Sequence, residues 1–172
     1  MEVELKKWEM KYVDELAKHA NNKKISDNVR DTFPYPYTKD DAIKFIKGCI
    51  ESDEDKNLQR AIIVDGSFAG GIGVHLQSDV HCKSAEIGYW LSETYWGKGI
   101  MSEAVKEMCR QAFERYDIVR IYAKAFRYNQ GSQKVLEKAG FKLEGILEKS
   151  VYKNGKIFDS CVYALINKEW EE

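Results

Sequence analysis

The chain has 172 residues, of which 44% are hydrophobic and 32% charged, a composition typical of one globular domain with its own core. Its formal net charge of -1 excludes the basic surface of a typical nucleic-acid-binding protein. No apolar run approaches the roughly 20 residues of a membrane span, and residues 1–10 lack a signal-peptide pattern. We therefore expect a cytoplasmic protein with a single domain, residues 1–172.

The cysteines and histidines form no cluster with the spacing of a metal site or a disulfide framework. The four cysteines lie far apart along the chain, which favours reduced, packed thiols. Cys82 could act as a nucleophile, because the strand that carries other polar candidates begins just after it. We expect no metal ion, and we interpret the three histidines as surface or hydrogen-bonded side chains.

Hydrophobic periodicity predicts strands and helices along the whole chain. Glycines at Gly70, Gly71 and Gly73 weaken one predicted strand but allow a bulge or a close backbone approach. In chain order, we predict a strand at 3–8, a helix at 10–20, a helix from after Thr38 to Ile50, strands at 59–64 and 68–76, an extended run from Ala85, a helix at 99–116, a strand at 119–126, a helix at 129–139, and strands at 141–152 and 157–167.

Turn-forming residues separate these elements. The prolines within residues 31–37 each remove an N–H donor and restrict the residue before them, so this segment is irregular. Thr38 is a candidate N-cap for the helix that follows, and Gly140 suits the end of helix 129–139. Asp65-Gly66 and Asn154-Gly155 are strong hairpin signals. The result is a mixed α/β domain with an antiparallel meander, a strand–helix–strand crossover and a closing hairpin.

The segment from Ala85 to Met108 is the most informative part of the chain. An extended run stops at the turn Gly97-Lys98-Gly99, and a helical pattern starts directly after it. This order directs several backbone N–H groups and the positive end of a helix dipole at one place. Such a place attracts a phosphate group.

Two common phosphate-binding motifs do not fit this turn. A P-loop requires Ser or Thr after Gly-Lys, and here Gly99 follows Lys98. A dinucleotide fingerprint requires a third glycine where Ser102 stands, and an acidic residue near the end of the next strand, where the chain reads 122–125 as Tyr-Ala-Lys-Ala. A tight turn without any ligand is the alternative interpretation.

Three motifs resemble those of the GCN5-related N-acetyltransferases (GNAT), in the RimJ/RimL subgroup that acetylates the N-termini of ribosomal proteins. They are YWGKGIMSEAV at 95–105, NQGSQKVLEKAGF at 129–141 and FPYPYTKDDA at 33–42, and the resemblance covers most of the chain. It implies a mixed, mostly antiparallel sheet of about seven strands flanked by about four helices. The loop departs from the family pattern R/Q-x-x-G-x-G/A, because Trp96 replaces the first polar residue and Met101 the last small one.

The resemblance also implies acetyl-CoA as the cosubstrate. Five consecutive backbone N–H groups would hold its pyrophosphate, those of Lys98, Gly99, Ile100, Met101 and Ser102. The Lys98 side chain would add a positive charge or extend into solvent. Strand 119–126 would splay away from the preceding strand, and the pantetheine arm would pair with the exposed backbone of Tyr89, Trp90 and Leu91, where an N–H could stabilise an oxyanion. Asn129 would contact the cofactor or cap its helix.

Two side chains are the candidates for proton transfer. Glu86 would act as the base that accepts a proton from the attacking amine, directly or through water. Alternatively, it is a surface carboxylate paired with a lysine such as Lys83. Many family members have a tyrosine acid where this chain has Leu136, whereas the subgroup resemblance assigns the acid to Ser132. Alternatively, Ser132 only bonds to the backbone at its helix start.

The aromatic residues of the irregular segment, Phe33, Tyr35 and Tyr37, would line an acceptor pocket or form a stiff connector. The predicted function is transfer of acetyl from acetyl-CoA to a primary amine of a protein N-terminus or small molecule, by direct attack in a ternary complex. A non-catalytic acyl-CoA-binding sensor is the alternative, and a nucleotide-dependent oxidoreductase comes third. We expect no nucleic-acid or membrane partner, and either a monomer or a homodimer.

Overall fold

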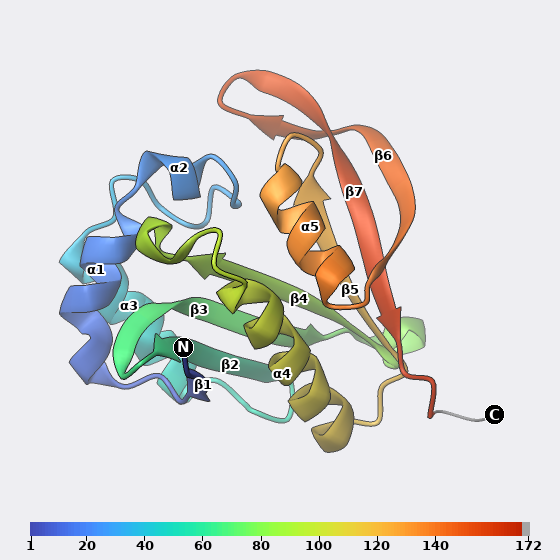
Figure 1. The fold of residues 1–172 in the computed structure, drawn as a ribbon, viewed down its shortest axis with the longest axis horizontal. Helices are drawn as coiled ribbons and strands as arrows, with labels where there is room; N and C mark the ends of the chain where they lie inside the picture. The colour runs from blue at the N-terminus through green and yellow to red at the C-terminus, as the bar shows by residue number, and fades with distance from the viewer. Residues whose placement is uncertain (170–172) are drawn as a thin grey trace.

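The computed structural model describes residues 1–169, which form a seven-stranded sheet of order β1-β2-β3-β4-β5-β7-β6 with helices on both faces (Figure 1). Every neighbouring pair of strands is antiparallel except β4 and β5. The elements are β1 Val3–Lys6, α1 Val13–Ala20, α2 Lys23–Ser26, α3 Lys39–Glu51, β2 Asn57–Val64, β3 Ser67–Leu76, β4 Ser84–Leu91, α4 Ile100–Arg115, β5 Arg120–Phe126, α5 Gln130–Lys138, β6 Lys142–Lys153 and β7 Lys156–Ile166.

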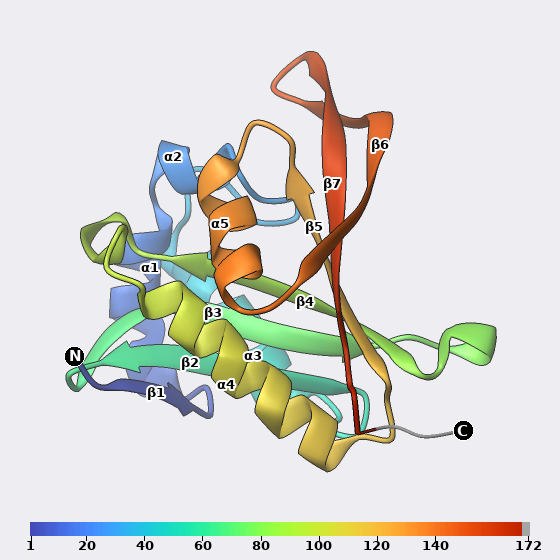
Figure 2. The same ribbon diagram turned by 45° about the vertical axis from the view of Figure 1, so that its right-hand side comes forward.

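Two hydrophobic cores lie on opposite faces of this sheet. The larger one packs α4 and α5 against the sheet and includes the fully buried Val105, Met108 and Leu136. The smaller one lies under α1 and α3 and includes Leu16 and Ile46. Figure 2 shows α4 running across one face while α1 and α3 lie behind the sheet. The fold class expected from the sequence is confirmed.

Most of the predicted elements are present, and the differences at their ends include the following. The first strand ends at Lys6 rather than at residue 8, because Trp8 turns into the smaller core, where it is 5% exposed. A 3-10 turn precedes α1, which therefore begins at Val13. The extended run from Ala85 stops at Leu91, and a 3-10 turn at Glu93–Tyr95 leads into the glycine turn.

Helix α2 was missed because its four residues are too few for a periodic signal. The side chain of Asn22 caps it by accepting a hydrogen bond from the Lys24 N–H at 2.9 Å.

The predicted cap at Thr38 is present as a complete capping box: Thr38 Oγ1 accepts from the Asp41 N–H, and the Asp41 carboxylate accepts from the Thr38 N–H. No helix within residues 1–169 combines the length and the hydropathy needed to cross a membrane.

The glycines of β3 permit the close approach that the sequence suggested. A methyl group on Gly70 would lie 2.3 Å from the carbonyl oxygen of Trp90 on the neighbouring strand β4. We expect Gly70→Ala to lower the free energy of unfolding by about 1–3 kcal/mol, because the strands must move apart. Urea denaturation measures this change. The control is Gly48→Ala in α3, where nothing lies within 4 Å and helix propensity should raise stability by up to about 1 kcal/mol. Equal stabilities of wild type and Gly70→Ala would contradict the expectation.

Candidate active site

The central strands β4 and β5 pair over a short stretch and then separate. Their parallel ladder contains only Ser84↔Arg120, Ala85↔Ile121 and Glu86↔Tyr122, although both strands continue beyond it. Backbone groups of β4 after Glu86 therefore face a gap instead of a ladder partner. The splay expected for this pair of strands is present.

The glycine turn meets one end of this gap. Gly97 and Gly99 have φ angles of 72° and 78°, a left-handed conformation that explains why glycine is needed at both positions. Gly99 is the N-cap of α4, and no side chain caps that helix start. Because the first N–H groups of a helix have no partner inside the helix, those of α4 remain available to a ligand.

A cavity of about 1530 Å³ extends from the glycine turn through the gap to the segment between α2 and α3. Its volume exceeds the roughly 300–1,000 Å³ typical of a pocket for one small ligand, so it has room for a cofactor and an acceptor together. Predicted site residues that line it are Phe33, Glu86, Tyr89, Trp90, Leu91, Gly99, Ile100, Met101, Ser102, Asn129 and Ser132.

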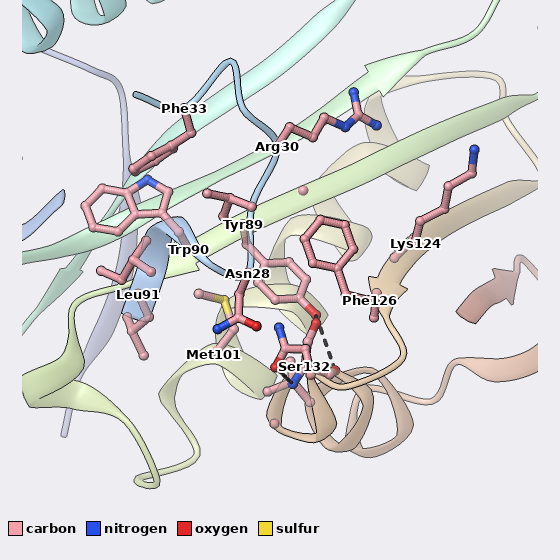
Figure 3. A pocket seen from close by; sticks show the side chains of 18 of the residues that line it. Asn28, Arg30, Phe33, Tyr89, Trp90, Leu91, Met101, Lys124, Phe126 and Ser132 are labelled. Carbon is pink, nitrogen blue, oxygen red and sulfur yellow. Dashed lines mark hydrogen bonds between the residues drawn. The ribbon is translucent and has the colours of Figure 1, made fainter. Parts of the chain in front are cut away.

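Ser132 and Tyr89 form a hydroxyl pair in the lining of this cavity. Ser132 Oγ and the Tyr89 hydroxyl share a hydrogen bond of 2.7 Å that joins α5 to β4 (Figure 3). Burial raises the pKa of Tyr89 to about 12, so its hydroxyl is protonated at neutral pH. Asn129 caps α5 by accepting from the Ser132 N–H at 3.2 Å. The helix cap thus holds the backbone of Ser132 while Tyr89 orients its side chain.

Glu86 lies on the opposite face of β4 from the larger core, and its side chain is 21% exposed. Its ion-pair partner is Arg30, from the segment after α2. Lys83, the suggested partner, instead pairs with Asp117. Tyr122 is the register partner of Glu86 on β5; burial first, and then this carboxylate, raise the pKa of Tyr122. The pairing with Lys83 was therefore wrong, because Lys83 precedes β4 and lies near the loop before β5.

The aromatic segment reaches the cavity through one residue. Phe33 lines it and packs edge-on against the Trp90 ring at a centroid separation of 5.6 Å. Tyr37 is 6% exposed within the smaller core, and Tyr35 is 49% exposed; neither lines the cavity. The Lys98 side chain donates to the Thr94 carbonyl at 3.0 Å and does not line the cavity either.

Sequence reasoning missed several polar side chains of this cavity. Arg30, Tyr122 and Lys124 line it or contact Glu86, and the Tyr89 hydroxyl reaches Ser132. For Tyr122 and Lys124, the alternation of the strand 119–126 offered a signal, since it places them on the face of Glu86 once the parallel register is known. Arg30 lies in an irregular segment and gave no local signal. Within residues 1–169, no group of His, Cys, Asp or Glu has the arrangement of a metal site.

Residues 2–142 match the family model of the acetyltransferase (GNAT) domain. The putative ribosomal N-acetyltransferase YdaF of Bacillus subtilis (strain 168) is 36% identical over 114 residues, which are 66% of this chain. Those residues cover 62% of YdaF, so the chain spans less than two thirds of that relative's length.

Two solved structures share the fold over nearly the whole chain. RimL, the ribosomal L7/L12 alpha-N-protein acetyltransferase in complex with coenzyme A, has a TM-score of 0.85 at 27% identity, covering 95% of this chain and 93% of RimL. The microcin C7 self-immunity acetyltransferase MccE, in complex with acetyl-CoA and AMP, has a TM-score of 0.84 at 28% identity, covering 96% of this chain and 93% of MccE.

Proposed function

Because this chain belongs to the acetyltransferase (GNAT) family, we propose that it transfers the acetyl group of acetyl-CoA to a primary amine of a protein N-terminus or a small molecule. The observation that carries the proposal is one cavity that joins an uncapped helix start, an unpaired strand edge and two proton-transfer candidates. The relatives YdaF and RimL, named for ribosomal acceptors, favour a protein N-terminus.

The residues of the cavity fit coenzyme A. The N–H groups from Lys98 to Ser102 would hold its pyrophosphate at the start of α4, where the helix dipole favours negative charge. The backbone of Tyr89, Trp90 and Leu91 would pair with the pantetheine arm, because β4 lacks its neighbour there. Asn129 would contact the same molecule from the start of α5.

Acetyl-CoA supplies a thioester carbonyl that a neutral amine can attack, with release of a thiol. In this proposal Glu86, on β4, accepts the proton that the amine loses. A backbone N–H of the separated stretch of β4 stabilises the negative oxygen that forms at the carbonyl. Ser132 donates a proton to the departing sulfur, and Tyr89 is a positioning residue that orients the serine hydroxyl through their 2.7 Å bond.

Saturating acetyl-CoA is expected to raise the melting temperature by about 5–10 °C when its concentration is about a hundredfold above Kd. Gly99→Ala should remove most of this shift, since a side chain at the left-handed N-cap displaces the N–H groups of α4. Thermal unfolding with and without acetyl-CoA measures both effects.

Gly66→Ala is the matched control for that experiment. Gly66 has a φ of 81° in the β2–β3 hairpin, so its replacement carries similar backbone strain away from the cavity. It should lower the melting temperature as Gly99→Ala does, yet keep the shift caused by acetyl-CoA. A chain that shows no shift at millimolar acetyl-CoA would end the proposal. A chain that binds acetyl-CoA but acetylates no amine or peptide, as measured by thiol release, would instead be a sensor.

A further inference from the structure

The charged side chains on the acceptor side of the cavity are almost all paired with one another. This side is the face of the sheet that carries Glu86, and its lysines and arginine have carboxylate partners: Lys24 with Glu93, Arg30 with Glu86, and Lys153 with Asp31. Lys124 is the exception, because within residues 1–169 it has neither an ion pair nor a side-chain hydrogen bond. The other unpaired lysines of the cavity, Lys134 and Lys138, belong to α5 on the opposite face.

Lys124 stands close to the proposed point of reaction. Tyr122 is the register partner of Glu86, and Lys124 follows two residues later on the same face of β5. That spacing is about 7 Å along the strand. Because β4 has separated from β5 at this level, Lys124 borders the gap on the side of β4, whereas on the other side it pairs with Val162 of β7.

Arg30 adds donors to the same region. One of its guanidinium nitrogens bonds to Glu86, and its side chain is 72% exposed, so its other N–H donors are available. In Figure 3 the ends of Arg30 and Lys124 lie on the side of the cavity away from Ser132. An acceptor that brings its positive amine to Glu86 competes with Arg30 for this carboxylate. Arg30 then needs a replacement anion.

We propose that Arg30 and Lys124 bind a carboxylate that the acceptor carries close to its amine. This inference rests on the proposed function and names its substrate class. The amine approaches Glu86, the carboxylate meets the two cations, and every charge on this side of the cavity then has a partner. Either an acidic side chain at the second position of a peptide or the α-carboxylate of a free amino acid offers this chemistry.

The test compares acceptors that differ in the charge carried close to the amine. Three peptides of equal length begin with Ser-Asp, Ser-Asn and Ser-Lys, and a second arm compares serine with serine amide. With acetyl-CoA saturating, we expect kcat/KM to be at least about tenfold higher for Ser-Asp than for Ser-Asn, and lowest for Ser-Lys. A preference for serine over serine amide, without a preference among the peptides, would assign the α-carboxylate as the bound group. A preference for Ser-Asp among the peptides, without one for serine, would assign the acidic side chain.

Two variants of Lys124 make the assignment specific. Lys124→Met should reduce the preference for Ser-Asp to within about twofold, and Lys124→Glu should reverse the order of Ser-Asp and Ser-Lys. The matched control is Lys142→Glu, an exposed lysine of β6 outside the cavity, which should keep the wild-type order. Melting temperatures with acetyl-CoA verify that each variant is folded.

The outcomes separate the two claims. Equal kcat/KM for charged and neutral acceptors in both arms, or a preference that persists in Lys124→Glu, would overturn the carboxylate site and leave acetyl transfer standing. Binding of acetyl-CoA without acetylation of any acceptor would overturn the proposed function, and the carboxylate site with it.

Discussion

Replacing Glu86 by glutamine is expected to lower kcat by about a hundredfold or more, the usual contribution of a positioned base. Glutamine keeps the size of the side chain but cannot accept the proton of the amine. The affinity for acetyl-CoA should change little, because Glu86 lies on the face of β4 opposite α4 and α5. Steady-state thiol release and a binding titration measure the two quantities separately.

The pH dependence of this variant distinguishes loss of a base from a structural effect. Above a pH of about 8, an α-amine is largely neutral and needs less help to lose its proton. The deficit of Glu86→Gln relative to wild type should therefore shrink as the pH rises through that value. A deficit of constant size from pH 6 to 9.5 would argue that Glu86 only organises the site through Arg30.

Glu144→Gln is the matched control for Glu86→Gln. Glu144 also pairs with an arginine, Arg120, at 2.5 Å, but it lies on β6 outside the cavity. Its replacement removes the same kind of ion pair, so turnover should stay near the wild-type rate. Unchanged turnover in Glu86→Gln would remove the assigned base and leave family membership untouched.

Ser132→Ala is expected to lower kcat by about ten- to a hundredfold, since the leaving sulfur loses its proton donor. Tyr89→Phe should have a smaller effect, because Ser132 keeps its hydroxyl but loses the 2.7 Å bond that orients it. The double variant should be no slower than Ser132→Ala alone if Tyr89 acts only through the serine. Rates for the wild type and the three variants form a double-mutant cycle that measures this coupling.

Tyr163→Phe controls for the loss of a buried hydroxyl. The Tyr163 hydroxyl bonds to Gln133 and Glu137 of α5, at 3.3 and 3.1 Å, and the residue does not line the cavity. Its replacement should affect stability more than turnover. Additive losses in Tyr89→Phe and Ser132→Ala would show that the two hydroxyls act independently, contrary to the positioning role proposed for Tyr89.

The position of the cavity is compatible with the two substrates of the proposed transfer. The larger core supports α4 and α5 on one face, and the smaller core supports the segment around Phe33 on the other. The gap between β4 and β5 opens through the sheet between these two layers. A cofactor on the helical face and an acceptor on the face of Glu86 can therefore approach the same point without competing for room.

Local sequence signals determined the elements and part of the site. The glycines at 97 and 99 indicated a tight turn in which both residues adopt a left-handed backbone conformation. Both φ angles are indeed positive. Thr38 predicted a helix start, and Asn129 stands three residues before Ser132, at a spacing suited to a cap. Each of these signals depends on backbone geometry within a few residues, and such geometry can be read from the sequence directly.

Only the tertiary structure decided which side chains meet. Glu86 and its partner Arg30 are 56 residues apart, and Tyr89 and Ser132 are 43 apart. Tyr37 enters the smaller core while Phe33 reaches the cavity, although both belong to one short aromatic segment. These outcomes depend on the sheet register, on helix packing and on the separation of β4 from β5, because these features place segments that are distant in the sequence. The pattern of side chains along the chain does not indicate how far apart such segments lie in space.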